Sequence, residues 1–155
     1  MRKALLTKTK LGSRPKGKGW YVLNVKDTVW YGNQEFGSCA IFEGDVRFTQ
    51  YGFNIHVLQP GQPNCYYHAE SEQEDFLVLS GTCRVLVEGK DVLLKAWDLV
   101  HCPPWTEHVF VGAGKGPCAV LMMGGRNPSG TVHYPRKAVA LRYKAGVKTP
   151  TDLPR

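Results

Sequence analysis

Two histidines and two glutamates are the residues of this sequence that are best suited to chemistry. His68, Glu70 and Glu74 lie within one segment of seven residues, and His108 follows in a later apolar run. Imidazole nitrogens and carboxylate oxygens form a borderline-to-hard ligand set that suits a divalent Zn, Fe or Mn ion. The sequence therefore predicts one divalent metal ion at these four residues, provided that the fold brings them together.

The segments around these residues have the alternation of β-strands. Residues two apart on a strand share a face, so Tyr66, His68 and Glu70 are expected to project together from the segment 65–70. After a short bend, Glu74 begins the next segment, which places its carboxylate opposite His68. His108 has the same parity on a later strand. The predicted ligands thus converge from neighbouring strands.

The pattern from residue 37 to residue 124 is that of an all-β sandwich or barrel. Short apolar or alternating runs are broken every eight to twelve residues by Gly, Pro, Asn or Asp. A tight hairpin turn is expected at the Gly89–Lys90 step. One more strand or short helix is expected within 131–145, from Ala138 to Tyr143. The predicted strands cover residues 37–43, 52–59, 65–70, 74–80, 83–88, 91–95, 98–102, 107–111 and 117–123.

The first histidine segment resembles a motif of the cupin superfamily. That motif reads G-(x)5-H-x-H-(x)3-4-E-(x)6-G, and His68-x-Glu70, Glu74 and Gly81 match it in every spacing after the first histidine. Gly61 lies one residue farther from His68 than the motif places its glycine. Glu70 stands where the family usually has its second histidine ligand. The resemblance implies that Glu70 is a fourth metal ligand.

The second cupin motif, G-(x)5-P-x-G-(x)2-H-(x)3-N, aligns on Pro103 and His108. Here Trp97 and Trp105 replace the two glycines, and Gly112 replaces the asparagine. Because some cupins have lost their ligands and their metal, these departures leave the fold well supported and the metal less so. The resemblance to the family covers about residues 37–124.

The resemblance implies a double-stranded β-helix, or jelly-roll barrel, that encloses a small-molecule site. Tyr66, Phe76, Trp105 and Phe110 flank the ligand positions and are expected to line the substrate pocket, although inward aromatic residues are equally common as plain core. The expected function is that of a metalloenzyme of oxygenase, isomerase or lyase type. The alternative is a non-catalytic module that binds or senses a small molecule. Cupins are commonly homodimers, so a homodimer is expected.

A structural interpretation of the histidines also exists. His68 and His108 would then be buried polar residues satisfied by the two glutamates. Metal binding is favoured, because two inward carboxylates without a cation are costly to keep ionised. His56 and His101 also lie in predicted strands, where the sequence favours core histidines over residues that support the metal ligands.

The charge distribution divides the 155-residue chain into three parts. Residues 1–19 contain seven basic and no acidic residues, and 126–155 contain seven basic residues and one acidic residue. The remaining 20–125 carry a net charge of −6 although the whole chain has +7. We therefore expect a barrel over 20–125 between basic N- and C-terminal extensions. The ends lack the interleaved aromatic residues of a base-stacking surface, which does not favour nucleic-acid binding.

Five cysteines without a C-x-x-C pair indicate reduced, mostly buried thiols and a cytoplasmic location. The apolar stretch near the start, Ala4–Leu6, is too short for a signal peptide. No apolar run approaches the roughly 18 residues of a membrane span, so no membrane partner is expected.

Overall fold

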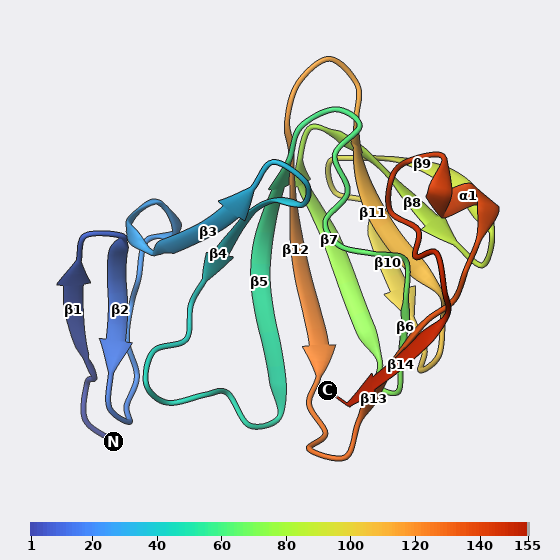
Figure 1. The fold of residues 1–155 in the computed structure, drawn as a ribbon. Coiled ribbons are helices and arrows are strands. Elements are labelled where there is room, and N and C mark those ends of the chain that lie inside the picture. Colours follow the sequence, from blue (N-terminus) through green and yellow to red (C-terminus); the bar gives the residue numbers. More distant parts are fainter. Residues whose placement is uncertain (155) are drawn as a thin grey trace.

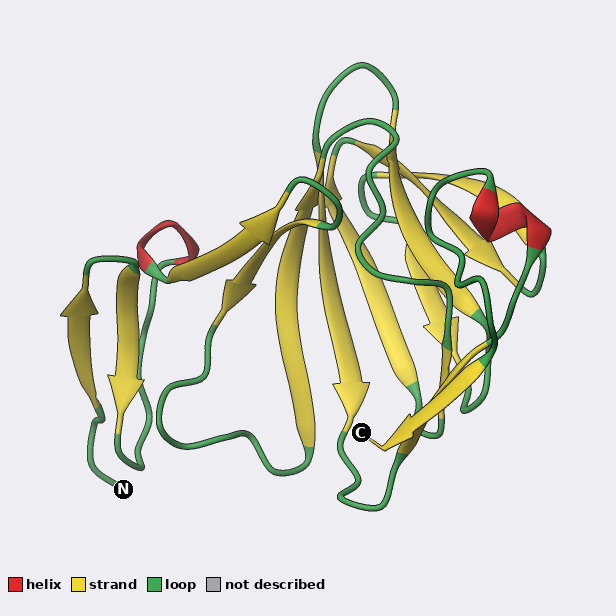
Figure 2. Ribbon diagram, in the orientation of Figure 1, coloured by secondary structure: helices red, strands yellow, loops and turns green. Residues whose placement is uncertain are grey.

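The structure is a computed structural model of the chain, and it describes residues 1–154. Strands dominate its architecture (Figures 1 and 2). The largest sheet is antiparallel and has the strand order β10-β7-β12-β5-β4-β3. Its strands are β3 (Val29–Asn33), β4 (Gly37–Ile41), β5 (Tyr51–Leu58), β7 (Glu74–Ser80), β10 (Leu99–Cys102) and β12 (Cys118–Gly125).

Three smaller sheets complete the fold, in the orders β11-β8-β9, β14-β13-β6 and β1-β2. Their strands are β1 (Leu5–Thr9), β2 (Gly12–Lys16), β6 (Ala69–Glu70), β8 (Thr82–Val87), β9 (Lys90–Lys95), β11 (His108–Ala113), β13 (Thr131–Tyr134) and β14 (Thr151–Pro154). The helices are short and comprise the 3-10 helix η1 (Val25–Asp27) and α1 (Ala138–Leu141).

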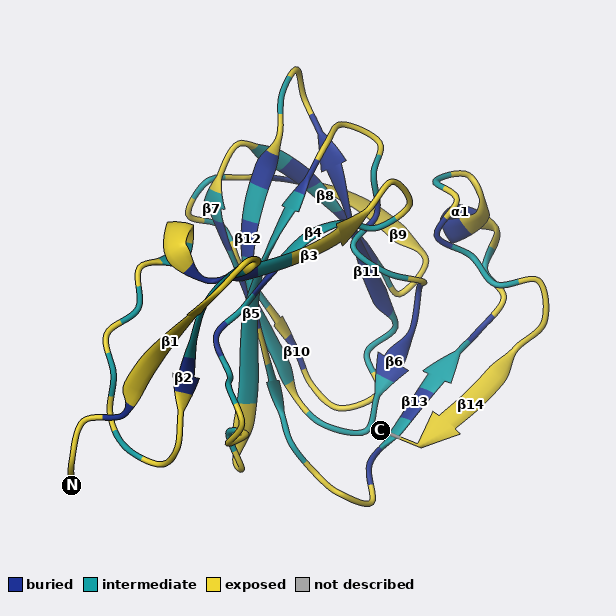
Figure 3. Ribbon diagram, turned by 60° about the vertical axis from the view of Figure 1, so that its left-hand side comes forward, coloured by how far each residue is buried: buried dark blue, intermediate teal, exposed yellow. Residues whose placement is uncertain are grey.

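The main apolar core lies between the largest sheet and the sheet of β8 and β11. Phe76 and Val78 from β7, Val120 from β12, Val85 from β8 and Phe110 from β11 are all buried there. They alternate with residues of the opposite face, as the strand period requires. Burying one such side chain stabilises the fold by about 1.5–3 kcal/mol. Figure 3 shows this buried layer in dark blue.

The predicted strands all appear, and most agree with the observed bounds to within two residues. The exception is the segment 65–70, of which only Ala69–Glu70 forms a strand. Just before it, the Tyr67 N–H donates to Ala145 O at 2.7 Å, so Tyr67 bonds the C-terminal segment and not a neighbouring strand. The all-β prediction is confirmed.

The predicted hairpin joins β8 to β9, and its turn lies one residue earlier than expected. Val87 pairs with Lys90, which leaves Glu88 and Gly89 as the two turn residues. Both have positive φ, 49° and 75°, the conformation of a type I′ turn that matches the twist of a hairpin.

Both terminal regions of the described residues 1–154 form secondary structure. The β1-β2 hairpin continues beyond β3 through a bridge between Ser13 and Thr28, and it projects away from the barrel (Figure 1). At the other end, Val139 and Ala140 of α1 pack on the outer side of β8 and β11, against Leu86 and Val109 among others. The predicted strand or short helix from Ala138 to Tyr143 corresponds to α1, whereas β13 was not predicted.

Candidate metal centre

His68 and His108 are held opposite each other by their own backbones. The His68 N–H donates to His108 O at 3.0 Å, and the His108 N–H donates to His68 O at 2.7 Å. Residues that exchange both bonds in this way lie directly opposite in an antiparallel pair. The two ring centroids are 4.9 Å apart. Two imidazoles that are distant in sequence thus share one site.

Backbone carbonyls set the orientation of both rings. His68 Nδ1 lies 2.7 Å from Tyr66 O, and His108 Nδ1 lies 2.9 Å from Thr106 O. Because a carbonyl oxygen only accepts, each Nδ1 carries a proton, and each Nε2 of the neutral ring keeps its lone pair. A hydrogen bond from the second ring nitrogen is the usual support of a metal-binding histidine.

The two carboxylates lie on the Nε2 side of the rings. Glu74 Oε2 is 3.4 Å from His108 Nε2, and Glu70 Oε1 is 3.7 Å from His68 Nε2. One ligand atom from each of His68, Glu74 and His108 lies within 4.8 Å of the other two. The structure therefore gathers three of the predicted ligands into one cluster and places Glu70 beside it.

Burial and neighbouring charges act on the two rings in different directions. Burial lowers the pKa of His68, but the Cys65 sulfur and the Glu70 and Glu74 carboxylates outweigh it and raise that pKa well above its ordinary value. Burial and the charge of His68 lower the pKa of His108 to about 4. At neutral pH the two rings together therefore carry one positive charge, on His68, in a place where a metal cation would also be favoured.

Two of the predicted pocket residues pack behind the cluster. The Phe76 ring centroid lies 4.9 Å from that of His108 and 4.6 Å from that of Phe110. Both phenylalanines are buried members of the apolar core. They fix the His108 ring against the interior, and their role in a substrate pocket stays a prediction.

Tyr66 is directed toward a different part of the chain. Its hydroxyl donates to Glu35 Oε1 at 3.0 Å, and its ring meets Phe36 edge-on at 4.9 Å. The expected parity with His68 requires a strand at Tyr66, and the strand begins only at Ala69. Tyr66 therefore touches the turn between β3 and β4, and its backbone carbonyl is what orients His68.

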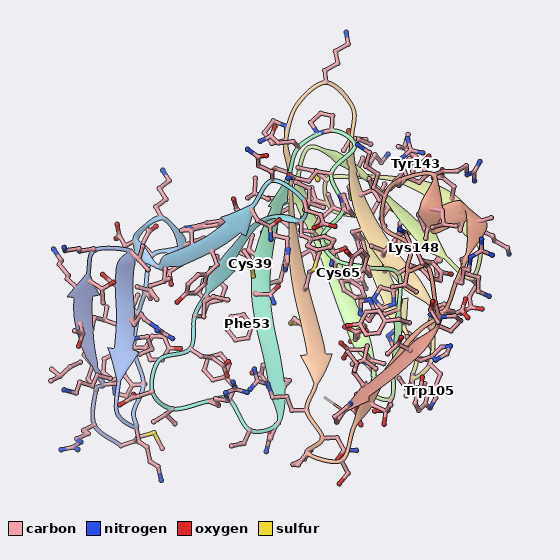
Figure 4. The ribbon with its side chains drawn as sticks, viewed as in Figure 1. Cys39, Phe53, Cys65, Trp105, Tyr143 and Lys148 are labelled. Carbon is pink, nitrogen blue, oxygen red and sulfur yellow. The ribbon has the colours of Figure 1, made fainter. Side chains whose placement is uncertain are left out.

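Trp105 lies beside the cluster and is anchored through its backbone. Its N–H donates to Glu70 O at 2.7 Å, while its side chain is 53% exposed. Figure 4 shows it near β13 and β14, and β13 pairs with β6 through Val132 and Glu70. Its placement suits contact with a ligand, which stays a prediction.

Tyr134 is a residue of this site that the sequence did not single out. Strand β13 carries it to within 5.8 Å of the His68 ring, measured between ring centroids. Burial raises the pKa of its hydroxyl, and the neighbouring charges that act on it are those of His68, Cys65 and Glu70. In this region the sequence predicted a strand or short helix only from Ala138 to Tyr143, so it gave no signal for a strand that carries Tyr134.

Two surface hollows, of about 300 Å³ and about 510 Å³, lie at the β1-β2 hairpin. Their linings include Arg14 and Asp45 in the first and Lys8 and Trp30 in the second. No residue of the cluster lines either of them. The convergence of ligand atoms, and not hollow size, therefore identifies the candidate site.

Comparison with known proteins agrees with this geometry. The cupin domain family matches residues 54–124, a stretch that contains all four candidate ligands. This chain is a cupin-domain protein. No curated protein matches it.

Solved structures support the cupin fold. A putative sugar phosphate isomerase from Acidithiobacillus ferrooxidans is 25% identical, with a TM-score of 0.51 over 54% of this chain and 55% of that chain. The chain thus spans about half the length of that relative. A cupin-superfamily sugar phosphate isomerase from Silicibacter pomeroyi is 19% identical, with a TM-score of 0.64 over 87% and 93% of the two chains. A protein described as a predicted oxalate decarboxylase from Thermotoga maritima is 19% identical, with a TM-score of 0.61 over 69% and 100%.

The donor set of this cupin domain fits a divalent ion. Both histidines direct an Nε2 toward the cluster, and Glu74 adds a carboxylate oxygen. Two imidazoles with one carboxylate form a set that binds Zn, Fe and Mn in proteins. With Glu70 as a fourth ligand, the two carboxylates would balance the charge of the ion.

The tryptophans at the cupin glycine positions keep a glycine-like backbone. Trp97 has φ 74° and Trp105 has φ 68°, in the left-handed region that residues with a Cβ avoid. The backbone of the motif is therefore retained although its residues have changed. Two exposed indoles are held at some conformational cost, one beside the cluster and one away from it.

Proposed function

We propose that this cupin is a metal-dependent enzyme that acts on a small, oxygen-rich organic substrate. The observation that carries the proposal is the convergence of His68, Glu74 and His108, with ligand atoms within 4.8 Å and both Nδ1 atoms already bonded to carbonyls. Glu70 is proposed as the fourth ligand. Trp105 is proposed to line the approach, with Phe76 and Phe110 behind the site.

The chain's own residues would position the substrate and control charge. A bound divalent ion supplies Lewis acidity for a carbonyl or hydroxyl oxygen. Phe76 holds the His108 ring from behind, which limits the directions from which a ligand reaches its Nε2. Glu74 and Glu70 together carry two negative charges, so a divalent ion bound beside them would leave little net positive charge at the site. The Tyr134 ring flanks His68 on the side of the C-terminal segment.

Isomerase or lyase chemistry is the reaction type that we favour. The relative with 25% identity is described as a putative sugar phosphate isomerase, and Lewis-acid activation of a substrate oxygen is the step that such chemistry needs. Oxygenase chemistry would instead need a redox-active ion, such as iron, at the same ligands. Affinity order and metal supply decide which ion occupies such a set.

Elemental analysis of natively purified protein, followed by activity assays with the ion found, tests this proposal. We expect about one divalent ion per chain, and product formation from a sugar phosphate or hydroxy acid without oxygen uptake. Iron with oxygen uptake would move the assignment to an oxygenase. One ion per chain without turnover of any substrate would indicate a binding or sensing module, and absence of metal after reconstitution would contradict the proposal.

We also propose that the protein is a homodimer. The β1-β2 hairpin projects from the barrel and leaves Leu5 and Leu11 largely exposed, so a second chain could cover them. Residues 1–19 are basic and the 20–125 region is acidic, so the hairpin of one chain is complementary to the barrel of another. Light scattering is expected to show a dimer that dissociates when residues 1–19 are deleted. A monomer at micromolar concentration would contradict the proposal.

The cytoplasmic location also stays a proposal. All five cysteines are free, and three of them are buried. Free thiols in this number suit a reducing compartment. Within residues 1–154, no helix is long and apolar enough to cross a membrane.

A further inference from the structure

Strand β5 carries two polar side chains whose shielded atoms lack partners. Asn54 Oδ1 and His56 Nδ1 are closed off from solvent and have no hydrogen-bond partner within residues 1–154. Buried polar atoms are nearly always paired, because an unpaired one destabilises the fold. Each of the two residues still has some accessible surface. Rotation by 180° about the last side-chain bond exchanges the shielded side of the amide or imidazole with its accessible side.

The two side chains face the same interior as the metal cluster. They share strand parity with Leu58, which lies in the apolar core. Across the sheet, Asn54 pairs with Met122, and Met122 pairs with Phe76, whose ring touches His108. One step along the interior from Asn54, His56 pairs with Val120. Asn54 and His56 thus extend the cluster's side of the barrel onto β5.

A cationic group lies on the same face, level with Glu74. The sheet neighbours of Glu74 on β12 and β5 are Gly124 and Gly52, which place no side chain on this level. The Arg126 guanidinium covers Gly52, with Nη2 only 2.7 Å from where a Cβ would stand. Two strand spacings, about 10 Å, separate the Gly52 and Glu74 backbones.

The chemistry of these groups defines what they can bind. Burial lowers the pKa of His56 to about 4, so the ring is neutral at pH 7 and offers one donor and one acceptor. An amide offers the same pair, and hydroxyl groups complement both. Arg126 Nη2 binds Glu43 Oε2 at 2.8 Å, the guanidinium's one acceptor within residues 1–154. Its remaining donors suit a phosphate or carboxylate.

We infer that Asn54, His56 and Arg126 bind the substrate of the proposed metal site, and that this substrate is a polyhydroxylated organic anion. Its hydroxyl groups pair with Asn54 and His56, and its phosphate or carboxylate pairs with Arg126. The substrate's remaining oxygens face His68, Glu74 and His108. The inference rests on the proposed function and assigns the residues that recognise its substrate.

Thermal-shift and calorimetric binding of four probes test the inference with metal-loaded protein. The probes are glucose 6-phosphate, gluconate, glucose and inorganic phosphate. We expect the two polyhydroxylated anions to bind more tightly than glucose or phosphate. Only they can pair both with Asn54 and His56 and with Arg126. The better of the two identifies the anionic group.

Variants assign the roles of the residues. Arg126→Gln is expected to weaken the anionic probes by about 10-fold to 100-fold and to leave glucose unchanged. Asn54→Leu and His56→Phe are expected to lose the probe-induced shift and yet to raise the melting temperature of the probe-free protein by about 2–4 °C, because each removes an unpaired polar atom. Cys39→Ala is the matched control, because Cys39 of β4 pairs with His56 of β5 and lies on the same face of the sheet. This variant should bind the probes like wild type.

The outcomes separate this inference from the proposed function. A protein that binds one ion per chain but none of the probes, or that binds them unchanged in all three variants, overturns the inference and leaves the metal site intact. A protein that binds no metal overturns the proposed function. If its anion binding still depends on Arg126, Asn54 and His56, these three residues form an anion-binding site without the metal.

Discussion

The two ends of the barrel interior differ although the same strands build both. Strand β7 begins with Glu74 in the metal cluster and continues to Val78 in the apolar core. Strand β5 ends at the fully buried Leu58, and its unpaired Asn54 and His56 lie between that end and the level of Glu74. The apolar side chains stabilise the fold, whereas the unpaired polar side chains destabilise it and are available to bind a ligand. Substitutions at the two ends should therefore have opposite consequences.

The largest effect is expected at the apolar end. Leu58→Ala removes a side chain that is fully buried in the core and leaves a cavity, so it should lower the free energy of unfolding by about 2–5 kcal/mol. Denaturant unfolding measures this change. The folded fraction should still bind metal in the wild-type ratio. A loss below 1 kcal/mol, or loss of metal from the folded protein, would show that the two ends are not independent.

Acid should destabilise the polar end through His56. Its pKa is about 4 when folded and about 6.5 when unfolded, so the unfolded state takes up the proton first as the pH falls. Stability should thus be complete above pH 6.5 and should decrease between about 6.5 and 4, by roughly 3 kcal/mol at most. The difference in unfolding free energy between wild type and His56→Phe, followed against pH, isolates this effect. A pH-independent difference would contradict it.

Glu70 tests whether the polar end holds a fourth ligand. Glu70→Ala should weaken metal binding by about 10-fold or more, whereas Glu70→His should retain the metal. Competition with a chromophoric chelator measures the affinity, and the visible spectrum of the cobalt-substituted protein reports the ligand set. Wild-type affinity and an unchanged cobalt spectrum in Glu70→Ala would place this side chain outside the metal's ligands.

The smallest effect is expected from the two strained tryptophans. Trp97→Gly and Trp105→Gly each relieve a left-handed backbone and should raise stability by about 1 kcal/mol. Only Trp105→Gly should also weaken small-molecule binding, because Trp105 is anchored to Glu70 whereas the Trp97 N–H bonds Val78 O, at the far end of β7. Equal effects of both variants on binding would remove Trp105 from the substrate site.

The sequence predicted what depends on local periodicity and missed what depends on distant packing. Alternation within 74–80 and 107–111 correctly placed Glu74 and His108 on one interior. The same reasoning failed at Tyr66, because the chain there bonds the C-terminal segment and its strand starts later. Tyr134 reaches the cluster through pairing between β13 and β6, and nothing within 131–145 specifies that register.

The N-terminal region shows the same limit. Residues 5–16 form a hairpin whose first strand is fully exposed and whose second strand has one buried residue, Pro15, so no buried alternation marks them in the sequence. The sequence also does not show that Asn54 Oδ1 and His56 Nδ1 are unpaired. It favoured a core role for His56. A satisfied core residue and a residue awaiting a ligand differ only in their neighbours.

Calorimetric titration of chelator-treated protein with a divalent ion tests the metal centre most directly. Wild type should bind about one ion per chain, and the His68→Ala/His108→Ala double variant should bind none while remaining folded. The double variant His101→Ala/His133→Ala is the matched control, because both of these histidines are exposed and paired with aspartates, Asp75 and Asp152. It should bind like wild type. A stoichiometry near zero in wild type, or full binding in the His68→Ala/His108→Ala variant, would contradict the account.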